Sequence, residues 1–215
     1  RSNNTAFQKR WPPVNPTFTE DVSARNVWDK IIHSAWRTAE PGILFWDTII
    51  RESPADCYAD VGFKSISTNP CSEIPISADD SCRLLVINLF SFVKNPYTKN
   101  AYFDFEEFYN VAQIAQRLMD DIVDLEEECV LRIIAKIESD PESNDIKYRE
   151  LALWKRILVA CQNGRRTGTG ITALGDTLAA MGVAYGSNAG IDNTEKIYKT
   201  LKFGCYRASV DMAKE

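Results

Sequence analysis

The sequence lacks several features that mark common classes of site. It has a single histidine, His33, and none of its six cysteines belongs to a Cys-x-x-Cys pair. Structural zinc sites use cysteine and histidine at such short spacings, so no metal-binding residues are predicted. A cysteine–histidine hydrolase would need a histidine base. His33 lies far from the other candidate residues, on a predicted amphipathic helix where we expect a structural role.

Long apolar runs and an excess of positive charge are also absent. No apolar run approaches the roughly 18 to 20 residues that a membrane-spanning helix needs. The net charge of −5 and the pI near 5.1 argue against a broad surface for nucleic acid. The N-terminus has no signal-peptide hydrophobic region and does not begin with Met, so we expect a processed chain or part of a longer one. We predict a cytoplasmic protein with reduced cysteines and with neither a membrane nor a nucleic-acid partner.

The 215 residues, 45% of them hydrophobic, are enough for one sizeable core. Prolines make residues 1–20 irregular, and Ser23 is a good cap for a helix that ends at residues 39–42. The apolar residues 43–49 are expected to form a short buried strand, followed by a polar connector. Residues 83–93 are rich in β-branched and apolar side chains, which predicts a second buried strand followed by a turn.

The rest of the chain is mostly helical in pattern. Asp104 is a good N-cap for the longest helix, and a further helix over residues 147–162 ends at Asn163-Gly164. A final helix is expected from near Asp192. Strand-like and helical segments alternate, which favours a helix-rich α/β fold. Three or four strands are too few for a closed barrel, so we expect a piece of a larger α/β domain.

Three features allow more than one interpretation. The acidic run 120–128 is interpreted as a solvated helix face in preference to a metal cluster. Gly168 and Gly170, after two arginines, fit either a phosphate-binding loop at a helix start or a turn with tight backbone packing. Cys129, Cys161 and Cys205 lie in apolar helical contexts and are predicted to pack as small hydrophobic side chains.

The stretch TNPCSEI, residues 68–74, places an amide, a thiol and a carboxylate at alternate positions. In an extended segment Asn69, Cys71 and Glu73 would point to the same side and could face one small ligand. The alternative is a proline-containing loop with a buried cysteine. Cys82 follows Cys71 by eleven residues and directly precedes the predicted strand, which could deliver it to the same cavity.

These side chains suit radical reduction of a diol-like substrate better than acyl transfer. A thiol can donate a hydrogen atom and, as a thiyl radical, abstract one from a C–H bond. A second cysteine can supply reducing equivalents by forming a disulfide with another thiol. Glu73 can accept a hydroxyl proton, and Asn69 can hold a neighbouring hydroxyl or carbonyl group.

The stretch TNPCSEIPISADDSC, residues 68–82, resembles the active-site loop of ribonucleotide reductase large subunits. The proline before the first cysteine and the position of the second are similar to the adenosylcobalamin-dependent class. Further similar segments follow the same order along nearly the whole chain: SNNTAF (2–7), VWDKIIHSAWRTAEPGILFWDTI (27–49), INL (87–89) and GRRTGTGITALGDTLAAMGVAYGS (164–187).

The resemblance implies that residues 1–215 are part of a ten-stranded α/β barrel with a central finger loop at about residues 66–82. It implies reduction of ribonucleotides to 2′-deoxyribonucleotides for DNA synthesis. Cys71 would be the thiyl radical that abstracts the 3′ hydrogen, and Glu73 would take the 3′-hydroxyl proton. Thr68, Asn69 and Glu73 would contact the substrate. Cys82 would be half of the cysteine pair that reduces the 2′ position.

The resemblance also implies partners. These are a ribonucleoside di- or triphosphate, adenosylcobalamin, a thioredoxin-like thiol reductant, the remaining segments of the enzyme and a second copy in a homodimer. Arg83 departs from the family pattern, which has asparagine after the second cysteine. The partner of Cys82 belongs to an earlier strand, and Cys57 is not at its expected position. The effector loops, the later phosphate loop and the C-terminal shuttle cysteines are also missing, so we expect residues 1–215 alone to be inactive.

Two alternatives stay open. The chain could belong to the class that draws its radical from a separate metal-containing subunit, although Pro70 and the spacing to Cys82 argue mildly against it. It could also be a non-catalytic helical interaction domain in which Cys71 and Cys82 are structural.

Overall fold

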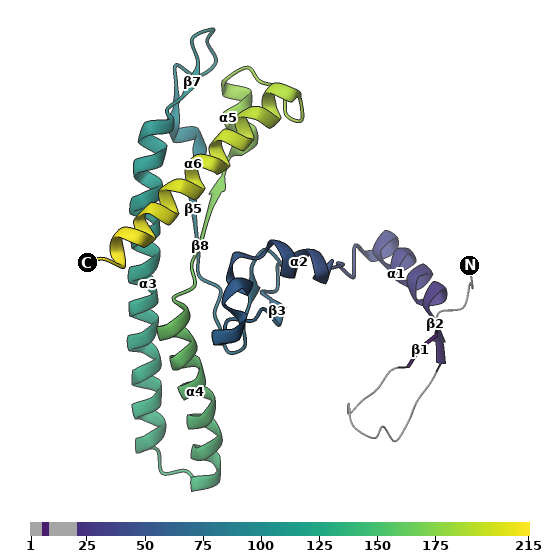
Figure 1. The fold of residues 1–215 in the computed structure, drawn as a ribbon, viewed down its shortest axis with the longest axis vertical. Coiled ribbons are helices and arrows are strands. Elements are labelled where there is room, and N and C mark those ends of the chain that lie inside the picture. The colour runs from purple at the N-terminus through teal and green to yellow at the C-terminus, as the bar shows by residue number, and fades with distance from the viewer. Residues whose placement is uncertain (1–5, 9–20) are drawn as a thin grey trace. The chain divides into compact units, whose positions relative to one another are not determined.

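The computed structural model describes residues 6–8 and 21–215, and the chain divides into two compact units between Glu52 and Ser53 (Figure 1). In the first unit, β1 (Ala6–Gln8) pairs antiparallel with β2 (Asp21–Ser23). The prediction of an irregular segment over residues 1–20 is therefore wrong for residues 6–8. The rest of that prediction, like most of the SNNTAF segment, lies outside the described residues.

Helix α1 (Ala24–Thr38) begins and ends where the sequence predicts. Ser23 Oγ accepts a hydrogen bond from the backbone N–H of Asn26 at 3.4 Å and caps the helix. The helix ends before Ala39, whose φ of 62° is left-handed, and Pro41 cannot continue it. His33 is exposed on α1, with its ring centroid 5.6 Å from that of Trp36.

Residues 43–49 do not form the predicted strand but lead into a helix, α2 (Trp46–Glu52). The backbone N–H of Ile49 donates to the carbonyl of Phe45 at 3.1 Å. A helix satisfies its backbone groups internally, whereas a strand needs a neighbouring strand. Phe45 is 73% exposed, so the prediction of a buried strand is wrong. Apolar character alone does not separate a short strand from a helix.

The second unit begins with η1 (Pro54–Val61), a 3₁₀ helix inside the predicted polar connector. Gly62 ends it with a left-handed φ of 104°, which glycine adopts without strain. The backbone N–H of Ser65 donates to Asp56 Oδ1 at 3.1 Å and ties η1 to the residues before the predicted finger loop. This hydrogen bond lowers the pKa of Asp56, because it stabilises the charged carboxylate.

A parallel pair of strands lies at the centre of the second unit. β5 (Leu84–Asn88) pairs with β8 (Gly168–Thr172), in register from Leu84 opposite Gly168 to Asn88 opposite Thr172. Two long helices, α3 (Phe105–Ser139) and α4 (Asn144–Gly164), make the crossover that parallel strands require, and they lie side by side (Figure 1). This arrangement agrees with the predicted helix-rich α/β class. The described strands form only two-stranded sheets, so a closed barrel is not seen among them.

The predicted strand over residues 83–93 is shorter than expected. After β5 the chain forms the 3₁₀ helix η2 (Leu89–Phe92) and then β6 (Val93–Lys94), which pairs antiparallel with β7 (Tyr102–Phe103). Asp104 caps α3 as predicted, since its Oδ1 accepts a hydrogen bond from the backbone N–H of Glu107 at 3.0 Å.

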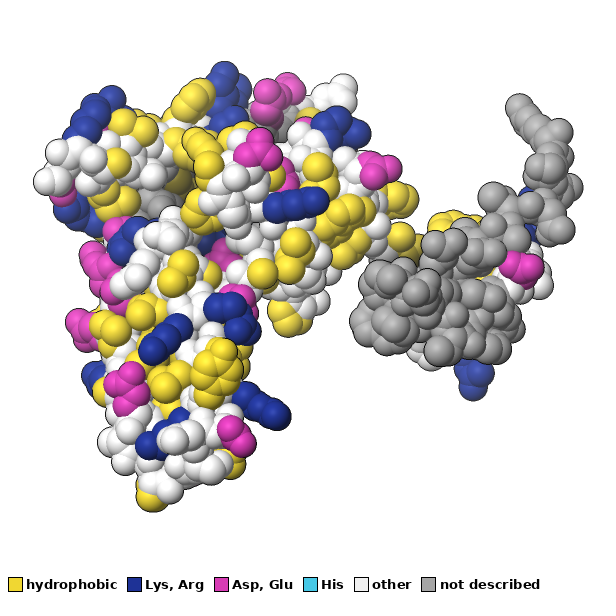
Figure 2. Space-filling view, turned by 60° about the horizontal axis from the view of Figure 1, so that its bottom comes forward, with side chains coloured by type: hydrophobic (Ala, Val, Ile, Leu, Met, Phe, Trp, Pro, Cys, Tyr) yellow, Lys and Arg dark blue, Asp and Glu magenta, His cyan; other side chains and the backbone are white. Residues whose placement is uncertain are grey.

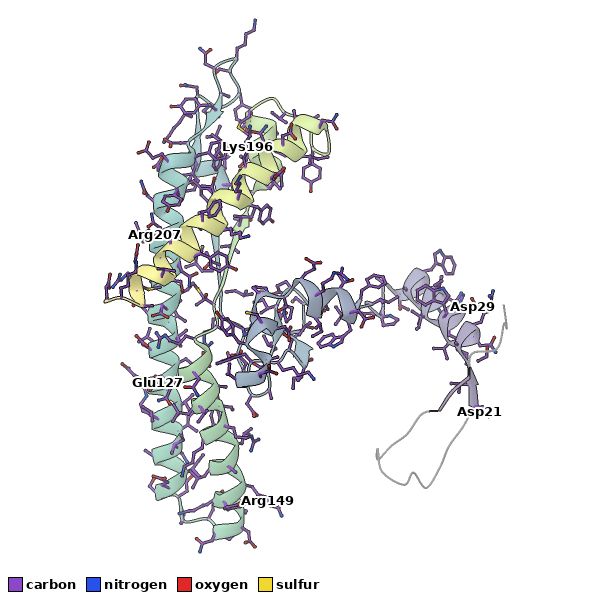
Figure 3. All side chains as sticks on the ribbon, in the orientation of Figure 1. Asp21, Asp29, Glu127, Arg149, Lys196 and Arg207 are labelled. Atoms are coloured by element: carbon purple, nitrogen blue, oxygen red, sulfur yellow. The ribbon has the colours of Figure 1, made fainter. Side chains whose placement is uncertain are left out.

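The acidic run 120–128 on α3 is bound to other elements and is not simply a solvated face. Asp120 and Asp124 form ion pairs with Arg165, each at 2.7–2.8 Å. Glu127, labelled in Figure 3, accepts a hydrogen bond from Gln162 of α4 at 2.6 Å. These contacts hold α3 against α4 and the residues that follow it.

Helices α5 (Leu174–Ala180) and α6 (Asn188–Met212) complete the unit. α6 is capped by Ser187 and begins earlier than predicted. α6 packs closely on α3 at Gly204, where an added Cβ would lie 2.8 Å from the Cβ of Ala112. The core contains side chains from β5, η2, β6, β7, α3, α5 and α6: Ile87, Leu89, Phe92, Val93, Phe103, Phe108, Ala112, Ala115, Ala180, Ile197 and Leu201.

Many hydrophobic side chains are exposed on the described surface, and Figure 2 shows them in yellow among charged groups. Leu84 and Val86 on β5 are 56% and 60% exposed, so one side of this strand is uncovered. Within residues 6–8 and 21–215, no helix combines the length and the apolar character that a membrane crossing requires.

Candidate active site

A β-hairpin carries the predicted finger loop. β3 (Ser67–Thr68) pairs antiparallel with β4 (Pro75–Ile76), and the backbone N–H of Asn69 continues the ladder by donating to the carbonyl of Ile74 at 3.2 Å. The backbone N–H of Ser72 donates to the carbonyl of Asn69 at 3.0 Å, which closes a β-turn with Pro70 at its favoured second position. Cys71 therefore lies at the tip of the hairpin.

The expectation of an extended segment with three side chains on one side is wrong, because the chain turns at these residues. Ser72 has a left-handed φ of 69°, which an extended strand does not contain. Asn69 is buried, with 4% of its surface exposed, whereas Cys71 and Glu73 are exposed. The expectation of a buried cysteine in the alternative interpretation is also not met.

Asn69 joins the base of the hairpin to Cys82. Its Oδ1 accepts a hydrogen bond from the backbone N–H of Ile74 at 2.9 Å, and its Nδ2 donates to Cys82 Sγ at 3.4 Å. Thr68 is half-buried, and its hydroxyl donates to the carbonyl of Asn69 at 3.0 Å. The structure thus brings together Thr68, Asn69 and Cys82, while Cys71 and Glu73 lie on the exposed loop.

A shallow cavity of about 510 Å³ lies between the hairpin base and helices α3 and α4. Cys82 is half-buried in its wall beside Asn69. Neither Cys71 nor Glu73 lines it, so this cavity does not unite all the predicted site residues. Its lining is Thr68, Asn69, Pro70, Ile76, Asp79, Asp80, Ser81, Cys82, Glu126, Trp154 and Ile157.

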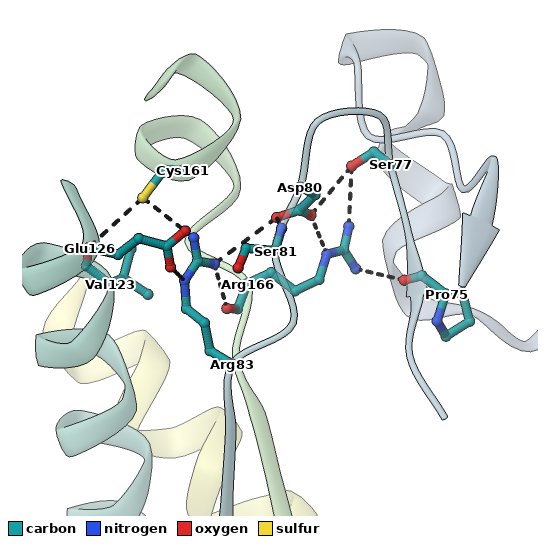
Figure 4. Close-up of polar contacts among 9 residues, drawn as sticks. All are labelled: Pro75, Ser77, Asp80, Ser81, Arg83, Val123, Glu126, Cys161 and Arg166. Atoms are coloured by element: carbon teal, nitrogen blue, oxygen red, sulfur yellow. Dashed lines mark hydrogen bonds and ion pairs between the residues drawn. The ribbon is translucent and has the colours of Figure 1, made fainter. Parts of the chain in front are cut away.

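Four charged side chains beside Cys82 were not identified from the sequence as part of the site: Asp80, Arg83, Glu126 and Arg166. They form one cluster of ion pairs (Figure 4). Arg83, at the position where the resemblance predicts asparagine, points into the protein, where it pairs with Glu126. The signal in the sequence was the departure of Arg83 from the expected asparagine. An arginine is almost never fully buried unless it is paired with an opposite charge.

The four cysteines other than Cys71 and Cys82 differ in their surroundings. All six cysteines are free. Cys161 is buried and Cys205 is half-buried, as predicted, and burial raises the pKa of both thiols. Cys129 is exposed on α3, so the prediction that it packs in the interior is wrong. Cys57 is exposed, and its thiol donates to the carbonyl of Pro54 at 3.0 Å.

The glycine pair after the arginines lies in a strand. Gly168 and Gly170 belong to β8, so this segment is not a phosphate-binding loop at a helix start. An added Cβ at Gly168 would lie 2.9 Å from the carbonyl oxygen of Arg83, which agrees with the alternative of tight backbone packing. Among the described residues, no group of three or more histidine, cysteine or acidic side chains is arranged to hold a metal ion.

Comparison with known families gives a match over almost the whole chain. Residues 6–215 match the family described as "Ribonucleotide reductase, barrel domain".

Curated relatives carry related names. The vitamin B12-dependent ribonucleoside-diphosphate reductase of Thermoplasma acidophilum is 28% identical over 94% of this chain and 22% of its own length. The protein of the same name from Mycobacterium tuberculosis H37Rv is 26% identical over 94% of this chain and 24% of its own length. The chain thus spans less than a quarter of the length of these relatives.

A solved structure shows a similar fold. The alpha subunit of the class Id ribonucleotide reductase of Actinobacillus ureae superposes with a TM-score of 0.60 at 21% identity. The match covers 88% of this chain and 32% of that subunit. At this level of identity the similarity concerns the fold alone.

Proposed function

Because this chain belongs to the ribonucleotide reductase barrel-domain family, we propose that the complete protein reduces ribonucleotides to 2′-deoxyribonucleotides. The observation that carries the proposal is the hairpin of the finger loop. It presents the exposed thiol of Cys71 at its tip and holds Asn69 against Cys82 at its base. A thiol that abstracts a hydrogen atom from a substrate must be accessible to it. The thiol that reduces the substrate must lie near the same loop.

The proposed reaction assigns a separate step to each side chain. The thiyl radical of Cys71 takes the 3′ hydrogen atom, which restores its S–H bond and leaves a carbon radical on the ribose. Glu73 takes the 3′-hydroxyl proton, and a proton from the thiol pair lets the 2′-hydroxyl leave as water. Cys82 and a second thiol supply two electrons and become a disulfide; their other proton goes to the 2′ carbon, and Glu73 returns its proton to the 3′ oxygen. The hydrogen atom returns from Cys71 to the 3′ position, so that the thiyl radical is regenerated.

Thr68 and Asn69 are proposed to position the ribose hydroxyl groups with Glu73. The contact of Asn69 with Cys82 supports this role, because Nδ2 carries two N–H donors and the contact with sulfur uses one. The second thiol of the redox pair is proposed to lie elsewhere in the complete protein. Cys57 is a weak candidate, because its thiol is engaged by the carbonyl of Pro54.

The names of the relatives favour adenosylcobalamin over a separate metal-containing subunit as the source of the radical. When bound, this cofactor supplies the one-electron chemistry that turns a thiol into a thiyl radical. Cys71 fits that chemistry because it is exposed at the tip of the hairpin. Dependence of turnover on added adenosylcobalamin would distinguish the two sources.

Further parts of the proposal concern context. Residues 1–215 are proposed to be part of the catalytic barrel, with the finger loop at about residues 66–82. A ribonucleoside di- or triphosphate is the proposed substrate, a thioredoxin-like protein the proposed reductant and a homodimer the proposed assembly. Six free cysteines support a reducing compartment such as the cytoplasm.

Replacing Cys71 by serine in the complete protein tests the proposed reaction. Serine keeps the size of the side chain but removes the sulfur, so C71S should lose deoxyribonucleotide formation while keeping its affinity for a ribonucleoside diphosphate. Product chromatography and equilibrium binding measure the two properties. C129S is the matched control, because Cys129 is also an exposed free cysteine but lies on α3.

An unchanged rate in C71S would instead support the interaction domain with structural cysteines. Loss of activity in both variants would mean that the effect is not specific to the finger loop.

A further inference from the structure

Arg166 contacts three points on the segment that joins the hairpin to Cys82 (Figure 4). Its Nη1 donates to the carbonyl of Pro75 at 3.1 Å, and its Nη2 donates to Ser77 Oγ at 3.4 Å. Its Nε pairs with Asp80 Oδ2 at 2.5 Å. One guanidinium group therefore holds the return strand of the hairpin and the residues that lead to Cys82.

Arg83 fixes the other end of this segment. Its Nη1 donates to the carbonyl of Arg166 at 2.9 Å, and its own carbonyl accepts a hydrogen bond from the backbone N–H of Gly168 at 2.8 Å. Its Nε pairs with Glu126 of α3, and its Nη2 contacts Cys161 Sγ of α4 at 3.4 Å. Cys82 thus precedes a residue that is bound to two helices and to β8.

Asp80 connects the two arginines. Its carboxylate is 2.5 Å from Arg166 and 4.0 Å from Arg83, and only 2% of its side chain is exposed. Two guanidinium groups and the carboxylates of Asp80 and Glu126 give the cluster no net charge. A buried, paired cluster of this kind specifies geometry more than it adds stability, because burying the charges offsets much of their attraction.

We propose that Arg166 is a positioning residue that sets where Cys71 and Cys82 lie relative to each other. This inference rests on the proposed function, because it assigns the two thiols to successive steps on one ribose. Arg166 touches neither thiol and acts through the segment that it holds. All three of its side-chain nitrogens are engaged by the protein, which argues against a direct role in binding a substrate phosphate.

The adjacent arginine provides a matched control. Arg165 pairs with Asp120 and Asp124 of α3 and, among the described residues, its side chain makes no hydrogen bond or ion pair with the hairpin segment. In the complete protein, R166K keeps a positive charge near Asp80 but cannot reproduce the three-point contact of a planar guanidinium group. R165K makes the same substitution at the adjacent residue but leaves the contacts between Arg166 and the hairpin segment intact.

We expect R166K to lower kcat by roughly 10- to 100-fold with little change in KM, because displacing a reacting group by about 1 Å has effects of this size. R165K should keep a kcat near that of the wild type. Alkylation of Cys82 by iodoacetamide, followed by peptide mass spectrometry, should become faster relative to Cys71 in R166K only. A residue that serves stability alone would lower Tm without changing kcat per folded molecule.

An unchanged kcat in R166K would overturn the proposal, and so would a rise in KM at constant kcat, which would mean contact with substrate. If R166K does not fold, S77A is the deciding variant. It removes the contact of Arg166 with the hydroxyl of Ser77 and the 3.5 Å hydrogen bond of that hydroxyl to Asp80, but it keeps the contacts of Arg166 with Pro75 and Asp80. S77A should then lower kcat by about 2- to 10-fold, and a wild-type rate would contradict the proposal. Failure of the proposed function can be distinguished from failure of the positioning role. If the proposed function is wrong, C71S keeps the wild-type rate of ribonucleotide reduction.

Discussion

Asn69 connects the finger loop to Cys82 through both ends of its amide group. The oxygen accepts the backbone N–H of Ile74, and the nitrogen donates to the sulfur of Cys82. With 4% of its surface exposed, this side chain is shielded from the water that would otherwise replace these contacts. The turn that presents Cys71 therefore depends on a polar side chain beneath it.

N69A should destabilise the hairpin, because it leaves the backbone N–H of Ile74 without its acceptor. Leaving a buried donor unsatisfied costs about 1–3 kcal/mol. The measurement is the denaturant midpoint of the purified complete protein. E73Q is the control, since Glu73 lies exposed on the same loop and should leave the midpoint nearly unchanged. Equal midpoints for N69A and the wild type would contradict the importance of this hydrogen bond.

From TNPCSEI and the eleven-residue step to Cys82, the sequence predicts that Cys82 reaches the cavity towards which the loop of Cys71 points. In the structure Asn69 contacts Cys82, but Cys71 does not line the cavity in which Cys82 lies. The prediction that Asn69, Cys71 and Glu73 point to one side was wrong, although Pro70 indicated a turn at this point. Arg166 and Asp80 lie 86 positions apart, and no local pattern shows which buried charges pair over such a separation.

Among the secondary-structure elements, β8 shows how a close contact between two chain segments can require a glycine. At Gly168 an added Cβ would lie 2.7 Å from Leu84 Cδ2 and 2.9 Å from the backbone carbonyl oxygen of Arg83. At Gly170 the nearest atom would be Val86 Cγ1 at 3.6 Å, an ordinary contact. Two glycines in one strand therefore have different requirements.

G168A should be destabilising, by about 1–3 kcal/mol, because the backbone at Arg83, directly before β5, must shift to admit the methyl group. G170A should be neutral or slightly stabilising, since alanine restricts the unfolded chain more than glycine does. Thermal unfolding of the purified complete protein compares the two variants. A similar fall in Tm for both would show that the requirement for glycine comes from the backbone of β8 and not from contact with Arg83.

Helices were predicted more accurately than strands. The caps Ser23 and Asp104 lie next to the helices that they start, so local sequence defined α1 and α3. The mainly apolar residues 43–49 gave no such signal, and residues 46–49 became part of α2 instead of a strand. β8 was missed because its identity depends on pairing with β5, which is distant in sequence.

For the chain as a whole, the described strands and the exposed finger loop fit a part of a larger barrel. The chain spans 22% of its Thermoplasma relative, and the side chains of Leu84 and Val86 are uncovered on β5. Hydrophobic side chains on a strand are normally covered by a neighbouring layer. We therefore expect further segments of the complete protein to pack against this strand.

Residues 1–215 expressed alone should not form deoxyribonucleotides, whereas the complete protein should do so under the same conditions. The reason is that the proposed reaction needs a second thiol beside Cys82 and a substrate-enclosing wall around Cys71. Chromatography of the products after incubation with ribonucleotide, adenosylcobalamin and dithiol measures the difference. Turnover by residues 1–215 alone would contradict this expectation.

The parallel pairing of β5 with β8 has a consequence for the order of events during synthesis of the protein. Arg166 and Asp80 are 86 positions apart, and a ribosome adding about 5–20 residues per second needs about 4–17 s to pass from one to the other. Until then β8 is not available to pair with β5, and Arg166 cannot hold the segment before Cys82. This segment thus acquires its fixed position only after both helices of the crossover have been made.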